Sequence, residues 1–160
     1  EIAFTLYRDS ARKDVAILAK SVFDNLINDR GHQIEIEEDY SVTLTDDKGE
    51  NAGTPSKGQA GIIALSLITA LSRNSVTNAP IILDSPMAGL DDDHKMKVWS
   101  FVNELADQVI LFVFPGEYKE DHRKHFKKHL VKEYTLHKKE GIFSANIVEG
   151  HHPEYFKGGK

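Results

Sequence analysis

The stretch PIILDSPMAGLDDDHKMKVWSFVNELADQVILFVF, residues 80–114, decides the fold class of this chain. An apolar run at 80–83 is followed by a helical pattern at 92–106 and by a second apolar run, QVILFVF. Continuous apolar runs of this length are typical of buried strands. The order strand, helix, strand predicts parallel strands joined by a crossover. The fold class is therefore α/β.

The segments on either side predict further helices and antiparallel strands. Residues 9–28 place apolar side chains at helical spacing, and Gly31 follows as a stop signal. The alternation in HQIEIEEDYSVTLTDDKGE, residues 32–50, predicts two short antiparallel strands. Pro55 and Gly58 open a long helix that runs to about residue 72. After Pro115 we expect a basic helix to about residue 129, then a closing hairpin from strands at 130–137 and 142–148 around the turn KKEG.

Composition sets limits on the class of protein. The chain has 160 residues and 40 % hydrophobic content, which is ordinary for one soluble domain. The absence of cysteine excludes disulfides and cysteine-ligated metal, and it suits a cytoplasmic location. The longest apolar run, 62–71, is much shorter than the roughly 20 residues of a membrane span. Because the sequence starts in what resembles a helix end, without methionine, we expect it to be part of a longer protein.

The segment TPSKGQAGIIALSLITAL, residues 54–71, carries the first chemical motif. A hydroxyl residue, Ser56, and Gly58 stand at the start of a helix, and Gln59 follows. Free backbone amides and the helix dipole at such a position favour an anion such as phosphate. The alternative is that Ser56 is an ordinary helix N-cap beside a flexible loop.

The segment IILDSPMAGLD, residues 81–91, carries the second motif. Asp84 ends an apolar strand, where an α/β sheet presents its ligand-binding crevice, and a carboxylate there suits a hydrated magnesium ion. Asp84 could equally cap the turn that follows, and Asp91 could be the N-cap of the next helix.

Together, in this order and spacing, the two segments resemble the ABC-type ATPases. PSKGQ resembles the signature loop, IILD the Walker B strand and AGLD the D-loop. Within that superfamily the chain is most similar to SMC-like heads, and within these to the DndD family of DNA sulfur-modification ATPases. The narrower likeness rests on the paired strands before the signature, on DSPMAGLDDDH, on the PGEY after the second buried strand, and on YTLHKKEG.

The resemblance implies a role for each matching residue. Ser56, Gly58 and Gln59 would contact the γ-phosphate of ATP held by the opposite head, Asp91 would cross the dimer seam, and Asp84 would hold the Mg²⁺ shell. Lys57 replaces the first glycine of the usual signature pair and adds a cation near the phosphate, or is simply a solvated side chain.

Catalysis is where the chain departs from the ABC pattern. Ser85 stands where most members have the glutamate that activates water, and a hydroxyl is a poor base at neutral pH. Phe114 and Pro115 lie where a switch histidine is usual, and Glu117 is the nearest ionisable candidate. We therefore expect slow hydrolysis, or a different base.

The segment after Pro115 offers weaker signals. His122, His125 and His129 lie on one helical face and could in principle share a metal. The neighbouring basic residues could bind a phosphate backbone, although a solvated helix face is favoured; they are Arg123, Lys124, Lys127, Lys128 and Lys132.

The sequence thus predicts three parts. Residues 1–31 would form a helix at the base of a coiled coil, or an ordinary packing helix; 32–149 the C-terminal ATPase lobe; and 150–160 a tail. Because no Gly-rich phosphate loop with its lysine is present, a Walker A lobe of the same protein must complete the ATP site. The expected partners are ATP, a second identical head, double-stranded DNA and DNA-processing proteins, without a membrane. The alternative function is a hydrolysis-deficient, ATP-gated scaffold.

Overall fold

The computed structural model describes residues 2–27, 31–138 and 144–153, with the side chain of Phe126 excepted. The elements in chain order are α1 (Ile2–Leu26), β1 (His32–Ile36), β2 (Val42–Asp46), α2 (Lys57–Asn74), β3 (Ile81–Asp84), α3 (Asp92–Phe101), the short 3₁₀ helix η1 (Val102–Glu104), β4 (Val109–Phe112), α4 (Glu120–Phe126), β5 (Tyr134–Lys138) and β6 (Ala145–Glu149). The α/β prediction is confirmed.

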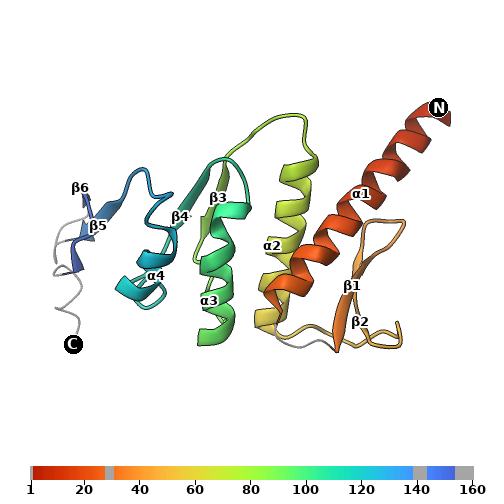
Figure 1. The fold of residues 1–160 in the computed structure, drawn as a ribbon, viewed down its shortest axis with the longest axis horizontal. Helices are drawn as coiled ribbons and strands as arrows, with labels where there is room; N and C mark the ends of the chain where they lie inside the picture. The colour runs from red at the N-terminus through yellow and green to blue at the C-terminus, as the bar shows by residue number, and fades with distance from the viewer. Residues whose placement is uncertain (1, 28–30, 139–143, 154–160) are drawn as a thin grey trace.

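The central unit is the predicted strand, helix, strand. β3 and β4 pair in parallel, with Ile81 opposite Val109 and Asp84 opposite Phe112. Along β3 the side chains of Ile81 and Leu83 are buried, whereas those of Ile82 and Asp84 are exposed. Because alternate residues face opposite sides of a strand, only one face of this sheet is covered by the described residues. α3 lies beside the sheet in Figure 1.

The other two strand pairs are antiparallel hairpins, as predicted. β1 pairs with β2 so that the buried side chains of Ile34 and Leu44 lie opposite each other. β5 pairs with β6, with Leu136 opposite Ile147. The predicted turn KKEG and the residues 142–143 of the last predicted strand lie largely outside the described residues, and β6 begins at Ala145.

α1 packs along α2 through its second half only (Figure 1). Its buried side chains, Ala19, Val22, Phe23 and Leu26, have the spacing of one helical face. Its first two turns extend away from the other elements, and Ile2, Phe4, Leu6 and Tyr7 are at least 66 % exposed. The helix therefore starts earlier than the predicted residue 9.

Two predicted helices end earlier than the apolar spacing indicated. α3 stops at Phe101 rather than 106, because the chain tightens into η1 before it turns into β4. The basic helix α4 covers Glu120–Phe126 and not the residues up to 129. Among the described helices, none is long and apolar enough to cross a membrane.

Candidate nucleotide-binding loops

The N-terminus of α2 is built around Ser56. Its hydroxyl accepts the backbone N–H of Gln59 at 3.2 Å, and the Gln59 side-chain oxygen accepts the backbone N–H of Ser56 at 2.8 Å. This reciprocal capping box satisfies two of the orphan donors of the helix. In the described part of the chain no hydrogen bond engages the N–H groups of Lys57 and Gly58, which leaves two donors for an anion. Ser56 is thus an N-cap, and the free amides beside it keep the phosphate interpretation open.

The PSKGQ loop and the AGLD loop lie against each other. A β-carbon placed on Gly58 would lie 3.3 Å from the carbonyl oxygen of Gly89 and 3.4 Å from Cδ2 of Leu90. Such distances are tighter than ordinary van der Waals contact, so the backbone at Gly58 approaches Gly89 in a way that suits a residue without a side chain. Two loops that are some thirty residues apart are therefore neighbours in space.

Asp84 and Ser85 end β3 with an unusual backbone. Ser85 has φ of 48°, in the left-handed region that favours glycine, and its N–H donates to the carbonyl of Phe112 at 2.8 Å. Its hydroxyl donates a long hydrogen bond of 3.4 Å to the carboxylate of Asp84. The buried side chains of Met87 and Leu90 anchor the turn that follows. The strand end is thus held from both sides while the Asp84 carboxylate stays exposed.

The Asp84 carboxylate is suited to a hydrated Mg²⁺ ion. The long bond from Ser85 is its only described hydrogen bond, so most of its oxygen lone pairs are available. Mg²⁺ usually keeps several waters and takes one or two carboxylates plus substrate phosphates. No group of three His, Asp or Glu side chains able to hold a metal occurs among the described residues. Among the described residues, Asp84 could therefore offer a single carboxylate to such an ion.

Asp91 is the N-cap of α3. Its carboxylate accepts the backbone N–H of His94 at 2.9 Å and lies 2.7 Å from Nδ1 of the same residue. The hydrogen bond from the His94 backbone, followed by that from its ring, lowers the pKa of the Asp91 carboxyl. An ionised Asp91 therefore starts α3 directly after the AGL turn.

Glu117 makes its hydrogen bonds within and beside the turn after β4, and not with the residues at the end of β3. It is 9 % exposed; its carboxylate accepts the N–H of Phe114 at 3.3 Å, and its carbonyl accepts the indole N–H of Trp99 at 3.2 Å. No hydrogen bond between described residues joins Glu117 to Asp84 or Ser85. These contacts account for Glu117 as part of the turn after β4.

The possible histidine metal site is not formed. His122 is buried, stacks on Trp99 with ring centroids 5.7 Å apart, and its Nδ1 lies 2.9 Å from the carbonyl oxygen of Glu117. That position belongs to the core, so His122 cannot join His125 and His129 on a solvent-facing site. Many of the neighbouring cations are also paired, Lys124 with Asp121 and Lys132 with Glu149.

Sequence reasoning missed a polar cluster that holds the last hairpin. Glu133 accepts the hydroxyl of Tyr118 at 2.6 Å and the guanidinium of Arg123 at 2.9 Å, and His151 lies 3.6 Å away. Burial would raise the pKa of Glu133, but the hydrogen bonds from Tyr118 and Arg123 outweigh it and hold that pKa below its usual value. Burial raises the pKa of Tyr118. No local sequence pattern brings these residues together, because they are spread over residues 118–151.

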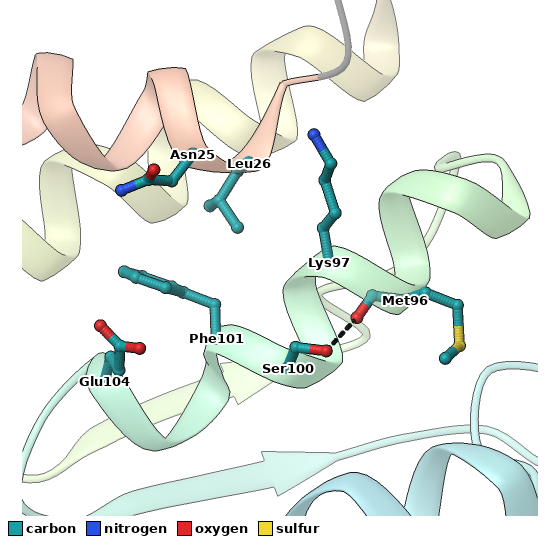
Figure 2. Close-up of a pocket in the computed structure, with 7 residues that line it drawn as sticks. All are labelled: Asn25, Leu26, Met96, Lys97, Ser100, Phe101 and Glu104. Atoms are coloured by element: carbon teal, nitrogen blue, oxygen red, sulfur yellow. Dashed lines mark hydrogen bonds between the residues drawn. The ribbon is translucent and has the colours of Figure 1, made fainter.

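A hollow of the described surface lies away from these loops. It measures about 460 Å³ and is open to one side, between the end of α1 and α3, as Figure 2 shows. Lys97 stands at its edge, and its ammonium donates to the carbonyl of Ile27 at 2.8 Å. The hollow holds none of the predicted site residues, so the loops and not the hollow define the candidate site.

Comparisons with known proteins identify the architecture. The chain superposes on a chain from a study of ATP-driven dimerization and DNA-stimulated activation of SMC ATPases, with a TM-score of 0.59, 14 % identity, and coverage of 95 % of this chain and 91 % of that one. It also superposes on an Smc head bound to the C-terminal winged-helix domain of ScpA. The TM-score is 0.63 and the identity 13 %, and the match covers 91 % of this chain and 45 % of that one. It superposes on the SMC head domain from Thermotoga maritima with a TM-score of 0.58 and 15 % identity, covering 89 % of this chain and 49 % of that one.

The fold is therefore a mixed α/β fold that resembles the SMC head domain. The chain spans less than half the length of the last two heads. No protein-family model matches the sequence, and no curated protein matches it either.

Proposed function

We propose that this chain is the C-terminal lobe of an SMC-like ATPase head that binds ATP between two heads. The observation that carries the proposal is the direct contact of the PSKGQ loop with the AGLD loop at the N-terminus of α2. On the fold of an SMC head, this contact gathers a capped helix start with free amides, a D-loop aspartate and the nearby strand-end carboxylate into one region.

Each residue then has a chemical task. The Ser56 hydroxyl and the free N–H groups of Lys57 and Gly58 bind the γ-phosphate of a nucleotide held mainly by the opposite head. Asp84 holds the water shell of Mg²⁺ in its own head, and Asp91 contacts the partner across the seam. ATP with its Mg²⁺ supplies the phosphoryl group, whose transfer to water separates the heads again.

The exposed face of the β3–β4 sheet supports a second lobe. Ile82, Ile110 and Phe112 are between 39 % and 61 % exposed on this face, which also carries Asp84. Parallel sheets occur almost only with both faces covered. We infer that the Walker A lobe of the same protein covers this face and brings its phosphate loop to Asp84. The exposed first two turns of α1 would likewise continue into a coiled coil.

The biological setting proposed is DNA-associated work in the cytoplasm. The segments DSPMAGLDDDH, PGEY and YTLHKKEG support DNA sulfur modification by a DndD-like ATPase, with repair and defence as related settings. The partners would be double-stranded DNA and DNA-processing proteins.

A second candidate is an ATP-gated scaffold that does not hydrolyse. Ser85 favours it, because a hydroxyl is a poor base and because Glu117 has its carboxylate directed to the turn after β4. In this case ATP would only hold two heads together while partners assemble.

Turnover and head association of the complete protein test both candidates. Asp84→Ala and Ser56→Arg are compared with the exposed control substitutions Asp47→Ala and Ser10→Arg. A slow wild-type turnover that both site variants abolish, with the controls unchanged, supports the ATPase. No wild-type turnover, with ATP-dependent association that Ser56→Arg weakens about tenfold or more, supports the scaffold. If ATP neither turns over nor associates the heads, both candidates are wrong.

A further inference from the structure

The side chain of Lys57 covers Gly89 of the AGLD loop. A β-carbon placed on Gly89 would lie 3.2 Å from Cδ of Lys57, 3.3 Å from Cγ and 3.4 Å from Cε. Three consecutive methylene groups of the lysine thus lie over one glycine. A glycine in place of Lys57 would have no side-chain atoms to make this contact.

Gly89 has a backbone that other residues adopt rarely. Its φ is +82°, and it stands two positions before Asp91, the N-cap of α3. The AGL turn is closed by the hydrogen bond from the Leu90 N–H to the Met87 carbonyl at 3.2 Å. A side chain that lies on Gly89 therefore restricts the turn that sets the position of Asp91.

The ammonium group of Lys57 does not contribute to this packing. No ion pair or hydrogen bond between described residues holds it. Long lysine side chains commonly lay their methylene stem on apolar surface and leave the charge in water. The stem and the charge of Lys57 can thus have separate tasks, the stem on Gly89 and the charge near an incoming anion.

We propose that the methylene stem of Lys57 is a positioning element that couples the PSKGQ loop to the D-loop within one head. A nucleotide that fixes Lys57 thereby fixes Gly89 and orients Asp91 toward the partner head. The expected effect of this coupling on ATP turnover rests on the proposed function. The packing of the Lys57 stem on Gly89 does not depend on the proposed function.

Two substitutions separate the stem from the charge. Lys57→Met keeps an unbranched apolar side chain that reaches as far as Cε and removes the charge, whereas Lys57→Ala removes both. Without nucleotide, hydrogen exchange of the Leu90 amide in the full-length protein reports on the AGL turn. We expect about fivefold or faster exchange in Lys57→Ala and wild-type exchange in Lys57→Met, with unchanged exchange in the α2 core around Leu65 as the control for global stability.

The consequence for the site is measured as ATP turnover per associated head pair at saturating ATP. Both variants lack the charge, so a loss of turnover common to both reports on the ammonium near the anion, whereas the loss of the stem should place Lys57→Ala about tenfold below Lys57→Met. Equal Leu90 exchange in the two variants, or equal turnover per pair, overturns the coupling. If the exchange results hold while wild-type heads neither associate with ATP nor hydrolyse it, the proposed function is wrong and the stem contact has only a structural role.

Discussion

Ser85 combines a serine side chain with a backbone that suits glycine. Its φ of 48° lies in the left-handed region, where a residue with a β-carbon costs on the order of 1 kcal/mol. The strand end tolerates this because the N–H of Ser85 bonds to β4 and its carbonyl bonds to the N–H of Ala88. The residue next to Asp84 is therefore held in place whether or not it takes part in chemistry.

A glutamate at this position should restore a general base. We expect Ser85→Glu to raise ATP turnover of the complete protein about tenfold or more, since a positioned base contributes two to four orders of magnitude in favourable cases. Ser85→Gln has the same shape and no basic group, so its turnover should stay at the wild-type level. A rise in both variants, or in neither, contradicts the view that the missing base limits hydrolysis.

At the scale of elements, hydrogen bonds from cationic side chains to backbone carbonyls join neighbouring helices at their ends. Lys97 of α3 donates to the carbonyl of Ile27, directly after the end of α1, where the helix dipole favours a cation. Arg73, near the end of α2, bonds to the carbonyl of Glu104 after α3 and stacks over the ring of Phe101. These contacts hold α3, whose N-cap is Asp91, against the two long helices.

Removing the Lys97 contact should loosen α1 from α3. We expect Lys97→Met to lower the free energy of unfolding by about 1 kcal/mol, because a charge-assisted bond to a helix end is lost while the stem is kept. Lys95→Met is the matched control: its ammonium is 3.5 Å from the exposed Asp92, a surface pair of little energetic value. Denaturant unfolding measures both, and equal losses would contradict a special role for Lys97.

The Glu133 cluster should make the attachment of the last hairpin depend on pH. The pKa of Glu133 is lowered in the folded protein, so the stability it contributes is complete above its unfolded value and is lost as the pH falls through the lower folded value. Glu133→Gln should cost about 1–2 kcal/mol at pH 7. Its difference from wild type should shrink as the pH falls below the ordinary glutamate pKa of 4.5. A difference that stays constant from pH 7 to strongly acidic pH contradicts this assignment.

At the scale of the whole molecule, the β3–β4 sheet has one covered and one uncovered face. The uncovered face carries the exposed side chains of Ile82, Ile110 and Phe112 beside Asp84. Contiguous apolar patches of this kind mark surfaces that contact another part of a protein or a partner. In the proposed head this face becomes an interior surface. The described lobe and the Walker A lobe should therefore depend on each other for folding.

A charged side chain on this face should leave the lobe able to fold but should disturb its assembly with the second lobe. We expect Phe112→Lys to improve the solubility of the 160-residue chain alone and to lower ATP turnover of the complete protein by about tenfold or more, because a lysine between two lobes is costly to bury. Val76→Lys, at a residue 96 % exposed in the loop before β3, should change neither. Full turnover in Phe112→Lys would show that no lobe covers this face.

The sequence predicted the order and pairing of the elements because their apolar patterns are local. Ile34 and Leu44 alternate with polar neighbours and pair as expected, and the buried runs of β3 and β4 lie parallel. Helix ends were less predictable: Val102 and Leu105 are buried like helix residues, although the chain there has already left the α-helix. Apolar spacing reports burial and does not distinguish an α-helix from a 3₁₀ turn.

The local geometry of the candidate loops was predicted in part, as the capping alternatives for Ser56 and Asp91. The caps at Ser56 and Asp91 follow from local residue types, and both are present. The contact of Lys57 with Gly89 and the attachment of Glu133 to Tyr118 depend on tertiary packing, which no local pattern encodes. His122 belongs to the core because Trp99 stacks on it, which the helical spacing of the three histidines did not reveal.

Trp99 is the only tryptophan of the chain and is fully buried. It stands on α3, the helix that Asp91 starts, with its ring 5.6 Å from that of Tyr118 and stacked on His122. Its fluorescence should therefore change whenever α3 shifts against the turn after β4. The chain thus contains its own optical probe of the D-loop helix, and movement of that helix can be followed in real time without a chemical label.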